Sequence, residues 1–110
     1  MGAVDWRATL TVLTGKQAGK VLVLDRNQVT VGRADDAGLV IDDPGVSAHH
    51  ARVAQTAHGT FYVEDLASAH GTFLGANAVG VALLRGGDIL RLGPSAQLRF
   101  DVIDPFGATS

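Results

Sequence analysis

The sequence contains no cysteine, only three prolines and few aromatic residues, which make up 5% of its 110 positions. Without cysteine there are no disulfides, no thiolate metal ligands and no cysteine nucleophile, so packing alone must hold the fold together. A framework of disulfides, typical of small secreted domains, is therefore excluded. We expect a cytoplasmic protein.

The chain also has no large excess of positive or negative charge, since the formal net charge is -2 and only 18% of residues are charged. The arginines are scattered and form no basic stripe that could neutralise a nucleic acid backbone. No run approaches the roughly 18 apolar residues that a membrane span needs. We therefore expect neither a nucleic acid nor a membrane partner, and the oligomeric state is not readable from the sequence.

Apolar residues make up 46% of the chain, which is enough for one core in a chain of 110 residues. We predict one domain over residues 7–104, preceded by an N-terminal extension, 1–6. Residues 105–110 carry little apolar weight and are interpreted as a C-terminal tail or the start of a linker.

Hydrophobic residues alternate with polar ones in several segments, which is typical of strands with one solvated face. This pattern is found at Ala8, Leu10 and Val12, at Phe61 and Val63, and at Leu98, Phe100 and Val102. The continuous apolar run 21–24 predicts a strand that is covered on both faces. No stretch of ten or more residues keeps a helical apolar stripe.

Turn-forming residues separate these segments at short, nearly regular intervals. They occur at 15–19, 26–27, 42–45, 58–59, 75–77, 86–87 and 93–94. Short strands with this spacing predict an all-β sandwich or barrel.

Two short stretches, Gly32-Arg33 and Ser47-Ala48-His49-His50, are joined by an acidic, turn-rich segment and are candidates for an anion site. A phosphorylated side chain carries close to two negative charges and three strong acceptor oxygens, so its reader needs a fixed guanidinium and short donors. Arg33 and Ser47 fit these needs. We expect Gly32 to let the backbone turn sharply and aim Arg33 outward. The turn before Ser47 would let its hydroxyl and neighbouring amides converge on an anion.

The adjacent histidines have a more modest interpretation. His50 is expected to hold a loop through side-chain hydrogen bonds, and His49 should point to the other side of the strand. The pair could not readily chelate one metal from the same face, so no metal site is expected.

Taken together, these residues resemble the forkhead-associated (FHA) domain, from about Leu10 to Ile103. The ordered motifs that carry the resemblance are Val29-Thr30-Val31-Gly32-Arg33, Leu39-Val40-Ile41-Asp42-Asp43, Val46-Ser47-Ala48-His49-His50-Ala51, Val63-Glu64-Asp65-Leu66-Ala67-Ser68, Gly71-Thr72-Phe73-Leu74 and Gly87-Asp88-Ile89-Leu90-Arg91-Leu92-Gly93.

The resemblance implies a β-sandwich of about eleven short strands in two antiparallel-rich sheets, whose loops at one end bind phosphothreonine in a partner protein. It implies a protein interaction module in signalling, with no catalytic residue and no cofactor. Peptide contacts would come from Arg33, Ser47, Ala48, Ala69 and His70. Structural residues around the site would be Gly32, His50 and Gly71.

The sequence also departs from the family pattern. His70 stands where asparagine is usual, Ala69 replaces a common threonine, Gly75 replaces an expected asparagine, and Ala48 offers only its backbone amide where a polar side chain is frequent. Because a hydrogen bond to a charged group is worth roughly 1.5 to 3 kcal/mol, one loss weakens binding about tenfold or more. The alternative is therefore a degenerate FHA domain that acts as a phosphate-independent interaction or structural module.

His70 itself has two interpretations. Beside an anion, the charged imidazolium would be favoured and would act as a second cationic donor, which predicts pH-sensitive recognition. Alternatively, its ring fills the place of the asparagine by a hydrogen bond to the loop backbone. Asp35 and Asp36, just beyond Arg33, would repel acidic peptide residues and favour basic ones.

Overall fold

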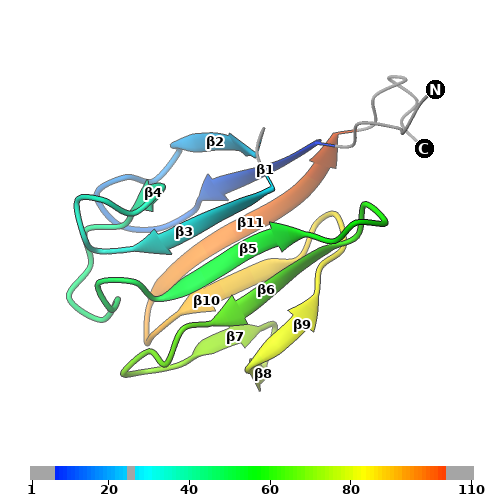
Figure 1. Ribbon diagram of the computed structural model, residues 1–110. Helices are drawn as coiled ribbons and strands as arrows, with labels where there is room; N and C mark the ends of the chain where they lie inside the picture. The colour runs from blue at the N-terminus through cyan, green and yellow to red at the C-terminus, as the bar shows by residue number, and fades with distance from the viewer. Residues whose placement is uncertain (1–6, 25–26, 104–110) are drawn as a thin grey trace.

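The computed structural model describes residues 7–24 and 27–103, and in these ranges it contains eleven β-strands and no helix (Figure 1). No segment of the described chain could therefore cross a membrane as a helix. In chain order the strands are β1 (Arg7–Val12), β2 (Val21–Leu24), β3 (Gln28–Gly32), β4 (Leu39–Val40), β5 (Ala51–Gln55), β6 (Phe61–Asp65), β7 (Thr72–Leu74), β8 (Asn77–Val79), β9 (Val81–Leu83), β10 (Ile89–Leu92) and β11 (Ala96–Ile103).

The strands form two sheets that pack face to face. One sheet has six strands in the order β2-β1-β11-β10-β7-β8, and the other has five in the order β4-β3-β5-β6-β9. The pairing is antiparallel except between β3 and β4, which run parallel. The predicted all-β sandwich of about eleven strands is thus confirmed.

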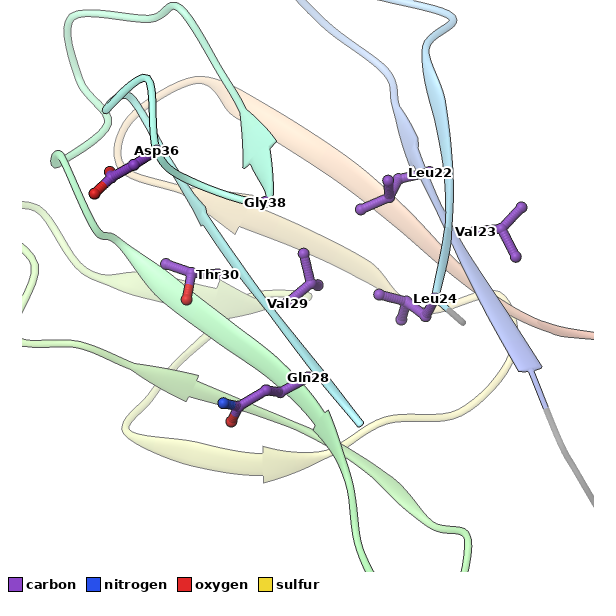
Figure 2. Close-up of a pocket in the computed structure, with 8 residues that line it drawn as sticks. All are labelled: Leu22, Val23, Leu24, Gln28, Val29, Thr30, Asp36 and Gly38. Carbon is purple, nitrogen blue, oxygen red and sulfur yellow. The ribbon is translucent and has the colours of Figure 1, made fainter. Parts of the chain in front are cut away.

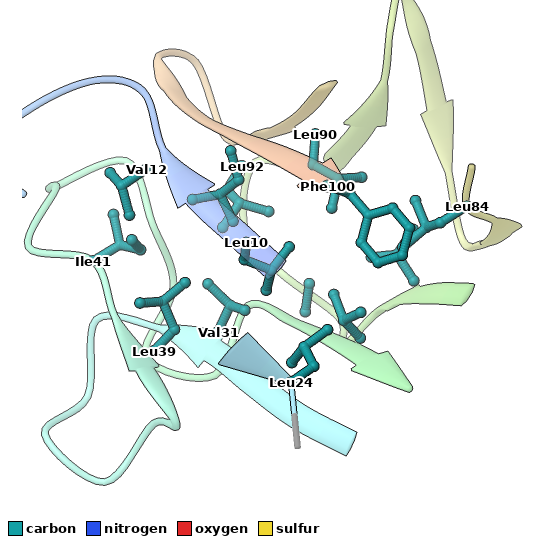
Figure 3. Packing of buried hydrophobic residues seen from close by; sticks show 14 of the residues in the cluster. Leu10, Val12, Leu24, Val31, Leu39, Ile41, Leu84, Leu90, Leu92 and Phe100 are labelled. Atoms are coloured by element: carbon teal, nitrogen blue, oxygen red, sulfur yellow. The ribbon is translucent and has the colours of Figure 1, made fainter. Parts of the chain in front are cut away.

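Alternating residues of both sheets fill the space between them, as Figure 3 shows. Leu10 and Phe100 lie opposite each other on β1 and β11 and are fully buried. The Phe100 ring also packs on Phe61 of the other sheet, with 5.3 Å between ring centroids. The period of two along the sequence therefore places one face of each central strand in a single core.

The interpretation of residues 21–24 as a strand covered on both faces is wrong. β2 is the edge strand of the six-stranded sheet, and 53% of Val21 and 45% of Val23 are exposed. Only Leu22 and Leu24 turn toward the core. An apolar run specifies a strand, but it does not reveal whether another layer covers its outer face.

Most of the expected turns lie between strands as predicted. The hairpin at 58–59 joins β5 to β6, and Gly59 adopts a φ of 87° that favours glycine. Arg26 of the predicted turn at 26–27 lies outside the described residues, as do the extension 1–6 and the tail 105–110. The described strands run from Arg7 to Ile103, and the predicted boundaries of the domain remain a prediction.

Candidate functional site

The loop after β3 and the loop before β5 are joined by their backbones. The N–H of Arg33 donates to the carbonyl of Ser47, and the N–H of Ala34 donates to that of Ala48, both at 3.0 Å. These two bonds continue the β3–β5 pairing beyond the sheet. The two candidate stretches of the sequence therefore lie side by side at one end of the sandwich.

Gly32 is required here for a reason other than the one expected. The glycines with positive φ do not include it, so the backbone makes no left-handed turn at this position. A Cβ atom built on Gly32 would instead lie 2.1 Å from the carbonyl oxygen of Ala48. Only glycine lets the two loops approach this closely.

The Arg33 side chain is exposed at the end of β3. Within residues 7–24 and 27–103, its guanidinium makes no hydrogen bond and no ion pair. Other arginines are engaged: Arg52 pairs with Glu64, and Arg99 with Asp101. Five N–H donors of Arg33 in a planar fork are thus available to a ligand.

Ser47 is held from two directions. Its N–H donates to Nδ1 of His50 at 3.0 Å, and its Oγ accepts the N–H of Ala69 at 2.9 Å. Because Oγ acts as an acceptor in the second bond, the hydroxyl hydrogen remains free to donate. The geometry therefore fixes the oxygen and leaves its donor for an anion.

His50 is fully buried and connects three loops. Its Nδ1 accepts from Ser47, so the ring hydrogen resides on Nε2, which donates to the carbonyl of Gly71 at 2.8 Å. The same carbonyl accepts the N–H of Gly93 at 2.9 Å. The expected role of His50, holding a loop by side-chain hydrogen bonds, is what the geometry shows.

The loop from β6 to β7 is shaped by Asp65, the last residue of β6. Its carboxylate accepts the hydroxyls of Ser68 and Thr72, at 2.5 and 2.8 Å, and the N–H of Ser68 at 3.2 Å. Ser68 Oγ in turn accepts the N–H of Gly71 at 2.9 Å. This network folds the loop back toward Ser47, and Ala67 within it adopts a φ of 57°.

The same contacts set the ionisation of Asp65. Partial burial raises the pKa of this carboxyl, but hydrogen bonds from the side chains of Ser68 and Thr72 and from the Ser68 amide outweigh it, and the pKa lies below the ordinary 3.8. The carboxylate is therefore charged at neutral pH. A charged acceptor strengthens each of the bonds that hold the loop.

The remaining predicted contacts surround Ser47 on the exposed surface. Ala48 and His49 lie in a turn, and neither backbone N–H has an acceptor among the described residues. Ala69 is exposed, but its N–H is already bonded to Ser47. The neighbouring His70 is exposed, and its ring makes no hydrogen bond within the described part of the chain. The interpretation that His70 bonds the loop backbone is therefore not what the structure shows.

The sequence matches the FHA domain family over residues 29–93. The chain belongs to the FHA domain family. The FHA fold accounts for all eleven described strands, and the family match runs from β3 through β10 and includes every residue of the candidate site.

Curated relatives of this FHA domain include two proteins of Mycolicibacterium smegmatis. The chain is 40% identical over 74 residues to the FHA domain-containing protein FhaB of Mycolicibacterium smegmatis, covering 67% of this chain and 47% of FhaB. It is 35% identical over 92 residues to the glycogen accumulation regulator GarA of the same organism, covering 84% of this chain and 58% of GarA. The chain thus spans about half the length of these relatives.

Solved structures are similar over nearly the whole FHA domain. An FHA domain of an Arabidopsis thaliana hypothetical protein superposes with a TM-score of 0.86 at 27% identity, covering 100% of this chain and 95% of that one. An FHA domain studied for phosphothreonine-dependent interactions has a TM-score of 0.77 at 27% identity, with 86% and 95% covered.

One contact within this FHA site was not anticipated from the sequence. His49 Nε2 lies 2.8 Å from Asp36 Oδ1, and the pair joins the β3–β4 loop to the β4–β5 loop on the exposed surface. His49 and His50 thus have different partners, but neither lies on a strand as expected, because His49 is in a turn and β5 begins at Ala51. Among the described residues no group of three or more acidic or histidine side chains could hold a metal.

The Asp65 network was also missed. Its signal in the sequence is the serine three residues after an aspartate, followed by a glycine, a pattern in which side chains replace backbone bonds in a tight loop. The Asp36–His49 pair has no comparable signal, because these residues lie 13 positions apart on different loops.

Proposed function

We propose that this FHA domain binds phosphothreonine-containing peptides of partner proteins, with the phosphate held by Arg33 and Ser47. The observation that carries the proposal is that Arg33, whose guanidinium has no partner among the described residues, and Ser47, whose hydroxyl oxygen is fixed, lie on loops joined by the Arg33 to Ser47 backbone bond. A similar solved FHA domain has phosphothreonine-dependent interactions, and another, FhaA, is complexed with the intracellular domain of Rv3910.

The site offers several kinds of hydrogen-bond donor to a phosphate dianion. Arg33 supplies a charged fork, Ser47 one O–H, and the turn at Ala48 and His49 two backbone N–H groups that have no acceptor among the described residues. These groups come from two loops at the same end of the sandwich. A phosphoryl group bound between the loops accepts hydrogen bonds from all of these donors, in place of water.

The residues that replace the usual polar side chains, His70 and Ala69, determine the other contacts of the site. His70 takes the position of an additional donor to the phosphate or to an acidic neighbour, since its ring is exposed and unengaged among the described residues. Ala69 offers its methyl and carbonyl to the peptide, because Ser47 already holds its N–H. In this proposal the domain recruits a partner in the cytoplasm and performs no catalysis itself.

The test is calorimetric titration of a degenerate phosphothreonine peptide pool, and then of its best member, into the parent domain and Arg33→Ala. Loss of a bidentate charged contact is expected to weaken binding roughly 100-fold or more. Arg99→Ala, on the β11 strand and paired with Asp101, is the matched control and should bind as the parent does.

Two results would contradict the proposal. One is equal binding of phosphorylated and unphosphorylated peptides, and the other is phosphate-dependent binding that survives Arg33→Ala. The absence of phosphate-dependent heat from a folded domain would favour the phosphate-independent module implied by Ala48, Ala69, His70 and Gly75. A His70→Asn variant in the same titrations, at mildly acidic and neutral pH, tests the role of that ring.

A further inference from the structure

A groove of about 410 Å³ lies between β2 and β3 (Figure 2). It is lined by Leu22, Val23, Leu24, Gln28, Val29, Thr30, Asp36 and Gly38. Leu22, Leu24 and Val29 point toward one another in Figure 2, whereas Gln28 and Thr30 point to the other side of β3. The groove thus follows the edge of β3, with an apolar floor and a polar rim.

The backbone edge of β3 is only partly covered at the groove, where Gly38 packs against Val29 and Thr30. β4 has two residues and pairs only with Val31 and Gly32. In the described chain, no strand lies beside the preceding segment of β3, 28–30, on that edge. β2, on the opposite wall, is itself the edge strand of the other sheet. An apolar floor between β2 and β3 can hold side chains of an extended peptide.

The groove is continuous with the proposed phosphate site. Asp36 lines the groove and belongs to the loop that begins at Arg33. Its carboxylate is paired with His49, which follows Ser47 and Ala48 on the neighbouring loop. A peptide whose phosphate lies between these loops can therefore extend along the same edge without leaving the surface of the domain.

We propose that this groove binds the flanking segment of the same phosphothreonine peptide, with an apolar side chain of that segment on Leu22, Leu24 and Val29. The inference rests on the proposed function. Val29 precedes Arg33 by four residues, roughly 13 Å along a strand. An extended peptide covers this distance in about four residues, so the apolar side chain lies about four to six residues from the phosphothreonine.

Charge indicates what else the segment carries. Among the described residues that line the groove, Asp36 is the one that carries a charge, and Asp35 beside it is exposed. Within the described chain Asp36 is paired with His49, and 78% of the Asp36 side chain stays exposed and accessible to a ligand. A flanking segment that alternates apolar and basic residues fits this surface, whereas an acidic segment is repelled.

The test compares synthetic peptides by fluorescence anisotropy against the whole domain. The short peptide is a phosphothreonine with two alanines on each side. Long peptides extend it by six residues on the N-terminal or the C-terminal side, with alternating leucine and lysine or, as matched controls, alternating serine and lysine. One leucine extension is expected to bind at least fivefold more tightly than its serine counterpart.

Two variants test whether the gain in affinity from the leucine extension arises in the groove. In Leu22→Ala the affinity ratio of the leucine and serine peptides should fall to about one. In Val21→Ala, on the same strand but outside the groove lining, the ratio should match that of the parent. If Leu22→Ala fails to fold, methyl NMR of the parent domain replaces it, and the leucine peptide should shift the methyl signals of Leu22, Leu24 and Val29.

The outcomes separate this inference from the proposed function. If the short peptide binds through Arg33 and neither leucine extension improves on its serine control, the groove proposal is overturned and the phosphate site stands. A leucine gain that persists in Leu22→Ala, or methyl shifts elsewhere, also overturns it. Self-association that Leu22→Ala abolishes would assign the groove to a second copy of the chain. If the short peptide shows no Arg33-dependent binding, both proposals fail.

Discussion

The four histidines of this chain show how surroundings decide what one side chain does. His50 is fully buried, and its ring nitrogens are bonded to backbone groups of its own loop, at Ser47, and of the β6–β7 loop, at Gly71. His49, next to it, is exposed and paired with Asp36. His70 and His58 are exposed at loop tips. Of these, we expect His50 to contribute most to stability, because its loss would leave the buried Ser47 N–H without its acceptor and would remove one of the two donors to the Gly71 carbonyl.

Replacing His50 with alanine is expected to destabilise the domain by about 2 to 4 kcal/mol. The substitution removes two hydrogen bonds and leaves the Ser47 N–H and the Gly71 carbonyl with fewer partners, beside a new cavity. Urea unfolding followed by circular dichroism measures the loss. His58→Ala, in the exposed β5–β6 hairpin, should change stability by less than about 0.5 kcal/mol. Equal effects of the two substitutions would contradict this account.

Asp65 makes the stability of the domain depend on pH in a defined direction. The folded-state pKa of Asp65 is lowered, so its contribution is complete above about 4, near the unfolded value, and is lost as the pH falls through the lowered folded value. Asp65→Asn should cost about 1 to 3 kcal/mol at pH 7. The difference between parent and variant should shrink as the pH is lowered toward 3. A difference that stays constant over this range would contradict the assignment.

At the scale of elements, the site depends on how closely the β3–β4 and β4–β5 loops approach each other. Gly32→Ala places a Cβ against the backbone of Ala48 and must push the loops apart, at a cost of about 1 to 3 kcal/mol. Phosphopeptide affinity should fall together with stability, since Arg33 and Ser47 would separate. Gly80→Ala is the matched control because nothing lies within 4 Å of its added Cβ. Gly32→Ala with unchanged stability and affinity would show that the loops can give way.

The strands and turns were largely predictable, because period-two alternation and glycine-rich turns are local properties of the sequence. The two errors concern properties that depend on distant residues. Val21 and Val23 proved exposed because β2 lies at a sheet edge, and sheet order is not encoded in a short apolar run. Gly32 proved necessary through contact with Ala48, which lies sixteen positions later in the sequence.

Prediction of the site had the same limit. Arg33 and Ser47 could be named from residue type, spacing and family resemblance, and the structure places their loops side by side. The bond from Ala69 to Ser47 and the Asp36–His49 pair could not be read from the sequence, since both join residues of different loops. Such contacts depend on the exact approach of loops, which the packing of the two sheets sets.

At the scale of the molecule, the residues that stabilise the sandwich and the candidate binding residues lie in different places. The core lies between the sheets and includes residues of nearly every strand, whereas the candidate contacts lie in loops at one end. Substitutions in loops that leave His50 and Asp65 intact can therefore change the ligand without changing the fold. This is consistent with a chain that keeps the FHA architecture while Ala48, Ala69 and His70 depart from the usual loop residues.

The most direct test of the phosphate site is an amide NMR titration of the domain with a phosphothreonine peptide and with its unphosphorylated counterpart. The largest phosphate-dependent shifts are expected at Ala48 and His49, whose N–H groups have no acceptor in the described chain, and at Arg33 and His70. Amides of the β5–β6 hairpin, at the opposite ends of these strands from the β4–β5 and β6–β7 loops, should not move. Identical shifts with both peptides, or phosphate-dependent shifts confined to other surfaces, would contradict the assignment of Arg33 and Ser47.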